Sequence, residues 1–169
     1  MQNSKQNVTI ILLVLSLIVV SGNFFSYYQQ SQQSTRAIIH NFATELGLAL
    51  NYIDDLKVGE DVTKVSQLHS MFITFDVMLK YGEGLYHNDY FGMYSQMLKK
   101  IEEHGEVTVK AKQHLNVLHA DLTELFERLY SIEKREVTVT QARHFNAAIG
   151  ETILPGLSKL FVERDIFNF

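Results

Sequence analysis

The chain has 169 residues, of which 46% are hydrophobic and 20% are charged, and it contains no cysteine. This apolar content excludes intrinsic disorder as the general state, and the lack of cysteine excludes disulfides and thiolate metal sites. Lys5 is the only charged residue among residues 1–35, so residues 36–169 hold the other 14 basic and all 19 acidic side chains, a net charge of −5. An acidic body without a basic stripe argues against nucleic acid as a partner.

An apolar stretch, residues 7–28, follows a short N-terminal segment, residues 1–6. Its strongest apolar run, from position 8 to position 20, covers 13 residues, a length typical of a signal peptide. With the aromatic residues that follow, the run reaches 21 residues, about 31 Å of helix, which matches the hydrocarbon thickness of a bilayer. The aromatic residues fit the interfacial belt of a spanning helix; they are Phe24, Phe25, Tyr27 and Tyr28.

We therefore predict a single-pass transmembrane anchor at residues 7–28 that contacts the lipid bilayer. Helical periodicity continues past Tyr28, which favours an anchor over the open alternative, a signal peptide cleaved near residues 20–22. Lys5 and the α-amino group predict a cytoplasmic N-terminus in the inner membrane. The rest of the chain is then extracytoplasmic, or periplasmic.

Residues 29–154 carry five sets of apolar residues at alternating spacings of three and four, and each set lies on one face of a predicted helix. The fourth set has the most regular pattern and predicts a helix of about 25 residues. The five sets are Ile39, Phe42, Leu46, Ala49, Ile53 and Leu56; Val65, Leu68, Phe72, Phe75 and Leu79; Phe91, Tyr94, Leu98 and Ile101; Ala111, Leu115, Leu118, Leu122, Leu125, Leu129 and Ile132; and Ala142, Phe145, Ile149 and Ile153.

Glycines and capping residues mark the expected helix boundaries. Asp61 and Asn88 are expected to cap the second and third helices, and residues 138–141, TVTQ, have the form of a capping box before the fifth. Pro155 is expected to kink or end that helix, which leaves residues 155–169 as a tail or short helix. Glycines that should follow the first three helices are Gly59, Gly82 and Gly105.

These patterns predict an all-α fold in which the transmembrane helix continues into an antiparallel four- or five-helix bundle with coiled-coil-like packing. In architecture this resembles the ectodomains of bacterial receptors, where a membrane helix extends into a four-helix sensing bundle. The resemblance implies one alternative function, a ligand-sensing bundle without an output domain. Apolar stripes left exposed would also allow a homo-oligomer.

Catalytic and metal-binding motifs are not found in the sequence. There is no Glu-x-x-His or His-x-x-x-His pattern for a metal, no Gly-x-Ser-x-Gly elbow and no phosphate-binding glycine loop. His114 and His119 are five residues apart, so they do not share a helix face. The seven histidines are interpreted as surface or capping residues, and Asp76 as solvent-facing unless it pairs with Arg128 or Arg143. We therefore predict no enzyme activity, no metal and no cofactor.

The most distinctive stretch of the body is YGEGLYHNDYFGMY, residues 81–94. Aromatic residues with polar tips favour binding surfaces, so five residues form a candidate partner or ligand surface: Tyr81, Tyr86, His87, Tyr90 and Tyr94. The alternative is that Phe91 and Tyr94 belong to the core. The leading hypothesis is a membrane-tethered helical bundle that acts by protein contact, as an accessory, scaffold or regulatory subunit of a membrane complex.

Overall fold

The computed structural model describes the backbone of residues 2–58, 62–85 and 90–162, and the side chains of residues 10–58, 63–85 and 90–153. These residues form five α-helices and one two-stranded antiparallel sheet, which confirms the all-α expectation. The chain divides into two units, Met1–Ser34 and Thr35–Phe169. Each unit is described by itself below.

The first unit is the N-terminal part of helix α1 (Gln2–Val58). Its large apolar side chains between Ile10 and Val20 are 51–68% exposed. By length and composition this helix can cross a membrane, since its most apolar window has a mean hydropathy of 2.2 and none of that window is buried. A signal sequence shares these properties. The Ser16 hydroxyl donates to the Leu13 carbonyl oxygen at 2.8 Å, so this polar group is satisfied within the helix.

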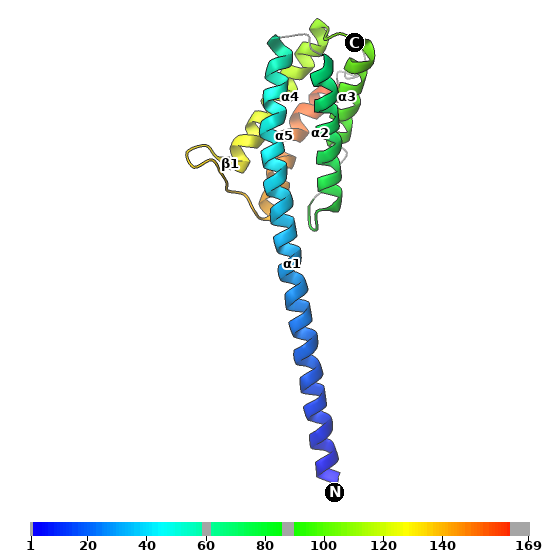
Figure 1. Cartoon of the computed structure of the whole chain (residues 1–169), viewed down its shortest axis with the longest axis vertical. Coiled ribbons are helices and arrows are strands. Elements are labelled where there is room, and N and C mark those ends of the chain that lie inside the picture. Colours follow the sequence, from blue (N-terminus) through cyan, green and yellow to red (C-terminus); the bar gives the residue numbers. More distant parts are fainter. Residues whose placement is uncertain (1, 59–61, 86–89, 163–169) are drawn as a thin grey trace. The chain divides into compact units, whose positions relative to one another are not determined.

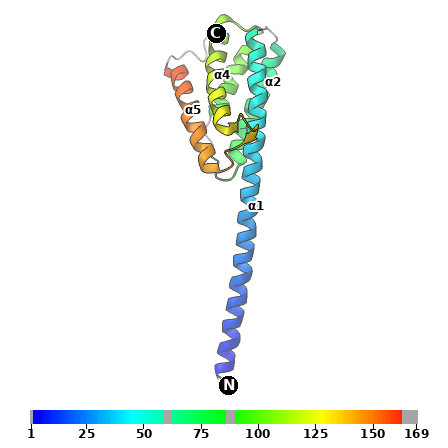
Figure 2. The same ribbon diagram turned by 90° about the vertical axis from the view of Figure 1, so that its left-hand side faces the viewer.

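The second unit is a bundle formed by the rest of α1 and four further helices. Figures 1 and 2 show these helices packed lengthwise, each running opposite to the one before it. Helix α2 packs on α3, and α4 packs on α5. The four helices are α2 (Val62–Tyr81), α3 (Tyr90–His104), α4 (Val109–Leu129) and α5 (Ala142–Val162).

The core of the bundle consists of the residues that the sequence pattern selected. Every member of the five predicted sets is buried except Ala142, which is half-buried, and Ile132, which is 67% exposed. Alternating spacings of three and four keep side chains on one face of a helix, so each helix contributes one stripe to a shared core. The prediction of which faces are buried is thus confirmed for all five helices.

Aromatic rings dominate the centre of this core. Five phenylalanines from α1, α2, α3 and α5 form what we call the phenylalanine cluster, with ring centroids 4.7–5.7 Å apart in tilted or edge-to-face contacts. Such geometry adds about 0.5–1.5 kcal/mol per pair beyond area burial. The cluster therefore joins four helices around one point; its members are Phe42, Phe72, Phe75, Phe91 and Phe145.

Helices α2 and α3 end next to the predicted glycines Gly82 and Gly105, and the third predicted glycine, Gly59, lies outside the described residues. Helix α3 ends at His104, and Gly105 follows it with φ +74°, the left-handed conformation that glycine adopts readily after a helix. Asp61 and Asn88, the expected caps, lie outside the described residues. Helix α4 has an N-terminal cap that the sequence pattern did not reveal. Its capping residue is Thr108, whose hydroxyl oxygen accepts a hydrogen bond from the Ala111 N–H at 3.1 Å.

Helix α5 does not end at the proline. It continues as one helix across Pro155 to Val162, so a boundary between bundle and tail at residue 155 is not seen. The expected capping box is also wrong. The Thr138 N–H and hydroxyl both donate to the Leu129 carbonyl oxygen, at 3.0 and 3.4 Å, and α5 begins only at Ala142.

A short hairpin follows α4, which ends at Leu129 and does not reach Ile132 as predicted. Strands β1 (Tyr130–Ser131) and β2 (Glu136–Val137) pair antiparallel, with the first residue of one opposite the last of the other. The Ser131 carbonyl oxygen accepts the N–H groups of Lys134 and Arg135, at 3.1 and 2.7 Å. This turn contains no Gly or Pro, which is why a helix was predicted through it.

Candidate functional site

The outer face of α2 is one exposed apolar surface of the bundle. Ile73, Val77 and Tyr81 are 48%, 45% and 75% exposed, and their spacing of four places them along one side of the helix. Nearby on α2, the hydroxyls of Ser70 and Thr74 each donate to the carbonyl oxygen four residues earlier, at 3.0 Å. These two hydroxyls are therefore satisfied within α2, while the three apolar side chains are exposed. We call these three apolar residues the α2 face.

The aromatic surface expected at residues 81–94 is contradicted at two of its five predicted residues. Tyr90 and Tyr94 are only 9% and 1% exposed, so both belong to the core, while Tyr81 is exposed and belongs to the α2 face. Tyr86 and His87 lie outside the described residues. The prediction erred because helical spacing turns positions 90, 91 and 94 toward the same core face.

Tyr94 also has a specific structural role. Its ring lies 5.9 Å from that of Phe72, and its hydroxyl donates to Oδ2 of Asp121 on α4 at 2.9 Å. Burial, the negative charge of Asp121 and this hydrogen bond raise the pKa of Tyr94 far above its ordinary value. The neutral hydroxyl thus connects α3 to α4.

A groove lies between α1 and the hairpin, with a volume of about 520 Å³. That volume falls within the range of small-molecule sites, roughly 300–1,000 Å³. Two of its residues, Leu48 and Ile132, are 46% and 67% exposed. The lining comprises Ala43, Thr44, Gly47, Leu48, Leu50 and Asn51 from α1, with Phe126, Tyr130, Ile132 and Arg135 from α4 and the hairpin.

Local packing shapes the groove. The Phe126 and Tyr130 rings are stacked, with centroids 4.9 Å apart and planes at 15°. A Cβ at Gly47 would stand 3.1 Å from Cε2 of Phe126, so the missing side chain lets α1 approach this ring. Because α4 ends at Leu129, Ile132 leaves the helix stripe and joins the groove.

The polar groups of the groove differ from others on the surface. Arg128, outside the groove, donates to Glu151 and Glu124 at 2.5 and 2.8 Å, and these hydrogen bonds raise its pKa. Arg135, the single charged residue of the lining, makes no side-chain hydrogen bond or ion pair with the described part of the chain. The Asn51 amide and the Tyr130 hydroxyl make none within those residues either.

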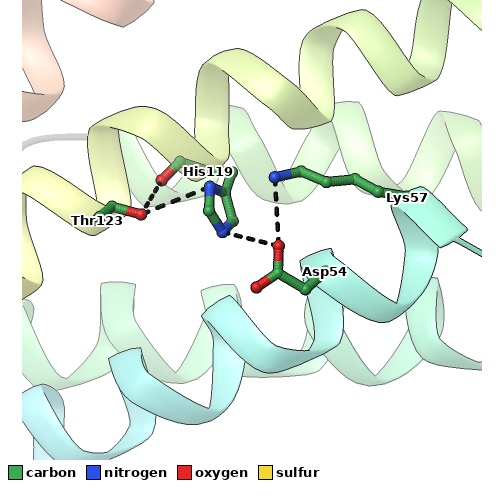
Figure 3. Close-up of polar contacts among 4 residues, drawn as sticks. All are labelled: Asp54, Lys57, His119 and Thr123. Carbon is green, nitrogen blue, oxygen red and sulfur yellow. Dashed lines mark hydrogen bonds and ion pairs between the residues drawn. The ribbon is translucent and has the colours of Figure 1, made fainter.

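A polar cluster connects α1 and α4 at another position (Figure 3). His119 Nε2 lies 3.0 Å from Oδ1 of Asp54, which also accepts a hydrogen bond from Lys57 at 3.3 Å. Partial burial raises the pKa of Asp54, but the hydrogen bond from Lys57 and the charge and hydrogen bond of His119 outweigh this, so the net pKa is lowered. The contact between Asp54 and His119 joins the two helices.

The order of hydroxyl, imidazole and carboxylate in this cluster is that of a catalytic triad. The Thr123 hydroxyl, however, donates to the His119 carbonyl oxygen at 2.8 Å and lies 3.5 Å from Nδ1 (Figure 3). A nucleophile needs its proton directed at the base, whereas here the proton is directed at the backbone. The geometry thus fits a structural contact between helices.

The remaining histidines and Asp76 differ in their burial and in their contacts. His40, His104 and His144 are exposed, as expected, and His69 lies 3.6 Å from Glu102 across α2 and α3. His114 is only 6% exposed, so its interpretation as a surface residue is wrong. Asp76 is half-buried, and neither Arg128 nor Arg143 pairs with it. Among residues with described side chains, no three His, Cys, Asp or Glu cluster as a metal site would need.

The residues expected at the membrane interface lie in the first unit. All four are between 54% and 71% exposed, as an interfacial aromatic belt would require. These residues are Phe24, Phe25, Tyr27 and Tyr28.

Sequence reasoning missed the groove and the α2 face, although one signal was present. Leu48, Ile73 and Val77 are apolar residues that lie off the predicted stripes, which is where an exposed apolar side chain would be found. Arg135 had no comparable signal, since its position depends on the turn. Comparisons with protein-family models, with curated proteins and with solved structures found no match to this chain.

Proposed function

We propose that this protein is a membrane-tethered, extracytoplasmic helical bundle that acts through protein contacts, as an accessory, scaffold or regulatory subunit of a membrane complex. The α2 face carries the proposal. Apolar side chains that follow one side of a helix at spacings of four are the pattern by which helices recognise other helices and grooves. In this bundle the α2 face is exposed while the opposite side of α2 is buried.

The tether is the apolar part of α1. Its length and composition suit a spanning helix, and the lone charge of Lys5 favours a cytoplasmic N-terminus in the inner membrane. The bundle, as the C-terminal body, is then extracytoplasmic. Mass spectrometry of the membrane fraction should recover peptides from residues 1–20. A mature chain that begins near Asn23 and stays soluble would contradict the tether.

Affinity purification of the full chain from detergent-solubilised membranes tests the contact surface. We expect a stoichiometric partner to co-purify with the wild-type chain. The Val77→Glu variant should lose this partner, because the substitution places a carboxylate in an apolar contact. Val109→Glu is the matched control, since Val109 is 77% exposed and lies on α4, and this variant should retain the partner. A wild-type chain that purifies as a monomer without a partner would contradict the proposal, whatever the variants do.

A second candidate function is ligand sensing, and the groove favours it. Apolar grooves of this volume with a few convergent polar groups are the usual form of a small-molecule site. A ligand that binds only the folded bundle raises the melting temperature in a saturable way. Such a rise on the full chain, abolished when the groove is altered, would support this candidate.

A further inference from the structure

The groove combines an apolar lining with side-chain donors that no described residue uses, and these two features together define the ligand that it would bind. Leu48 of α1 and Ile132 of the hairpin both line it with exposed side chains, and the Phe126–Tyr130 stack adds a flat aromatic surface. An apolar body bound there would cover surface that is now exposed to water, which is the main favourable term in such binding.

The charge of the groove selects the head group of that ligand. Arg135 is the one charged lining residue, and within the described residues its guanidinium has no acceptor, in contrast to Arg128 with its two glutamates. A guanidinium presents paired N–H donors that match a carboxylate in bidentate geometry. One cation balances one negative charge, whereas a phosphate monoester, with a charge of about −1.5 to −2, would remain partly uncompensated.

The backbone holds Arg135 in place. Its φ of +51° is in the left-handed region, which is unfavourable for a residue with a side chain, and its N–H donates to the Ser131 carbonyl oxygen at 2.7 Å. The turn therefore fixes the backbone at Arg135, whose side chain lines the groove, at some cost to stability. Asn51 and Tyr130 supply further donors that no described residue uses.

We propose that this groove binds a single-chain amphiphile with a carboxylate head and an apolar body, the chemistry of a fatty acid. Arg135 pairs with the carboxylate, Asn51 and Tyr130 donate hydrogen bonds near it, and the chain lies along Leu48, Ile132 and the aromatic stack. This inference rests on the second candidate function, ligand sensing, and is independent of protein contact through the α2 face.

Photolabelling of the full chain in phosphatidylcholine nanodiscs tests the site. The probe is dodecanoate with a diazirine near the end of its chain, and labelled peptides are mapped by mass spectrometry. We expect labels within residues 43–51 and 126–135, competed by unmodified dodecanoate. Arg135→Gln should reduce groove labelling about tenfold or more, because hydrogen bonds to charged groups are lost. Lys134→Gln makes the same charge change at a neighbour outside the lining and should leave labelling unchanged.

Further variants and competitor molecules test the roles of the head group and of the apolar body separately. Leu48→Gln should reduce labelling, while Val109→Gln, at an exposed position outside the groove, should not. Dodecanol and dodecyl phosphate should compete less well than dodecanoate. Circular dichroism confirms that each variant is folded.

The inference would be overturned by equal labelling of Arg135→Gln and Lys134→Gln, by labels confined to residues 10–28, or by stronger competition by dodecyl phosphate than by dodecanoate. A cross-link between Leu48 and a second copy, or a partner protein, would show that a macromolecule covers the groove instead. If the groove fails these tests while partner capture still depends on Val77, protein contact survives and only the fatty-acid site is lost.

Discussion

The phenylalanine cluster and the groove both involve α1 and aromatic rings, yet they differ in what is left open. In the cluster all five rings are buried and contact one another. In the groove Phe126 is half-buried, two aliphatic side chains are exposed, and the side-chain polar groups of Asn51, Tyr130 and Arg135 have no partner among the described residues. The cluster therefore contributes strongly to the stability of the fold, whereas the exposed side chains of the groove contribute little to it. Substitutions in the two regions should have correspondingly different effects.

The largest effect is expected in the phenylalanine cluster. Phe42 contacts Phe75, Phe91 and Phe145 at centroid distances of 4.7, 5.5 and 5.1 Å, so Phe42→Ala leaves a cavity between α1 and three other helices. We expect a loss of about 3–5 kcal/mol in the free energy of unfolding, measured by urea denaturation. Phe126→Ala in the groove should cost less, about 1–2 kcal/mol. Equal losses would remove the distinction between the two regions.

Tyr94→Phe tests the polar contact at the edge of the cluster. Loss of the hydrogen bond to Asp121 should lower the free energy of unfolding by about 1–2 kcal/mol. The folded pKa of Tyr94 is raised above its ordinary value of 10.0, so its contribution is fully present below that pH and is lost as pH rises above it. The stability of the wild type should therefore fall more steeply in alkali than that of Tyr94→Phe. Parallel curves would contradict this role.

Asp54→Asn tests the polar cluster of α1 and α4 (Figure 3), where the expected effect is smaller. The Asp54 side chain is 59% exposed, so its ion pairs should contribute at most about 1 kcal/mol. Because its folded pKa is lowered below 3.8, the contribution is present above that pH and is lost as pH falls through the folded value. Acid titration of stability should thus separate wild type from Asp54→Asn only at higher pH. A difference that persisted at low pH would indicate a packing effect.

The smallest effect on stability is expected in the groove. Leu48→Gln changes an exposed side chain and should alter the free energy of unfolding by less than about 0.5 kcal/mol, although it reduces dodecanoate labelling.

Gly47→Ala removes a flexible residue from a helix, a gain of up to about 1 kcal/mol, but it also places a methyl group about 3.1 Å from the Phe126 ring. Since that ring is only half-buried, we expect it to shift and the net effect to be a small stabilisation. A strong destabilisation would show that the groove wall is rigid core.

Much of the fold could be predicted because its elements depend on local spacing. The stripes on α1, α2 and α3 and the positive φ of Gly105 follow from helical period and from glycine chemistry. The hairpin could not be predicted, since Ile132 continues the helical spacing of α4 and residues 130–137 contain no turn-forming Gly or Pro. The capping role of Thr138 failed for the same reason, because its partner is Leu129 across the hairpin.

The candidate site was predicted less well than the fold. The aromatic composition of residues 81–94 suggested a surface, but helical geometry places Tyr90 and Tyr94 inside and leaves Tyr81 outside. Which of two apolar residues is covered depends on the neighbouring helix, and that information is not local. Leu48 and Ile132 are far apart in sequence and form one groove only through the packing of α1 beside the hairpin.

By itself, the sequence determined the helical class, the faces that become core, and the presence of an apolar helix long enough to span a membrane. These are properties of spacing and composition within single segments. Only the tertiary structure decided that α4 stops at Leu129, that Arg135 lines a groove in which no described residue accepts its hydrogen bonds, and that the three residues of the α2 face are exposed. Each of these depends on contacts between distant segments, which side-chain periodicity along one helix does not encode.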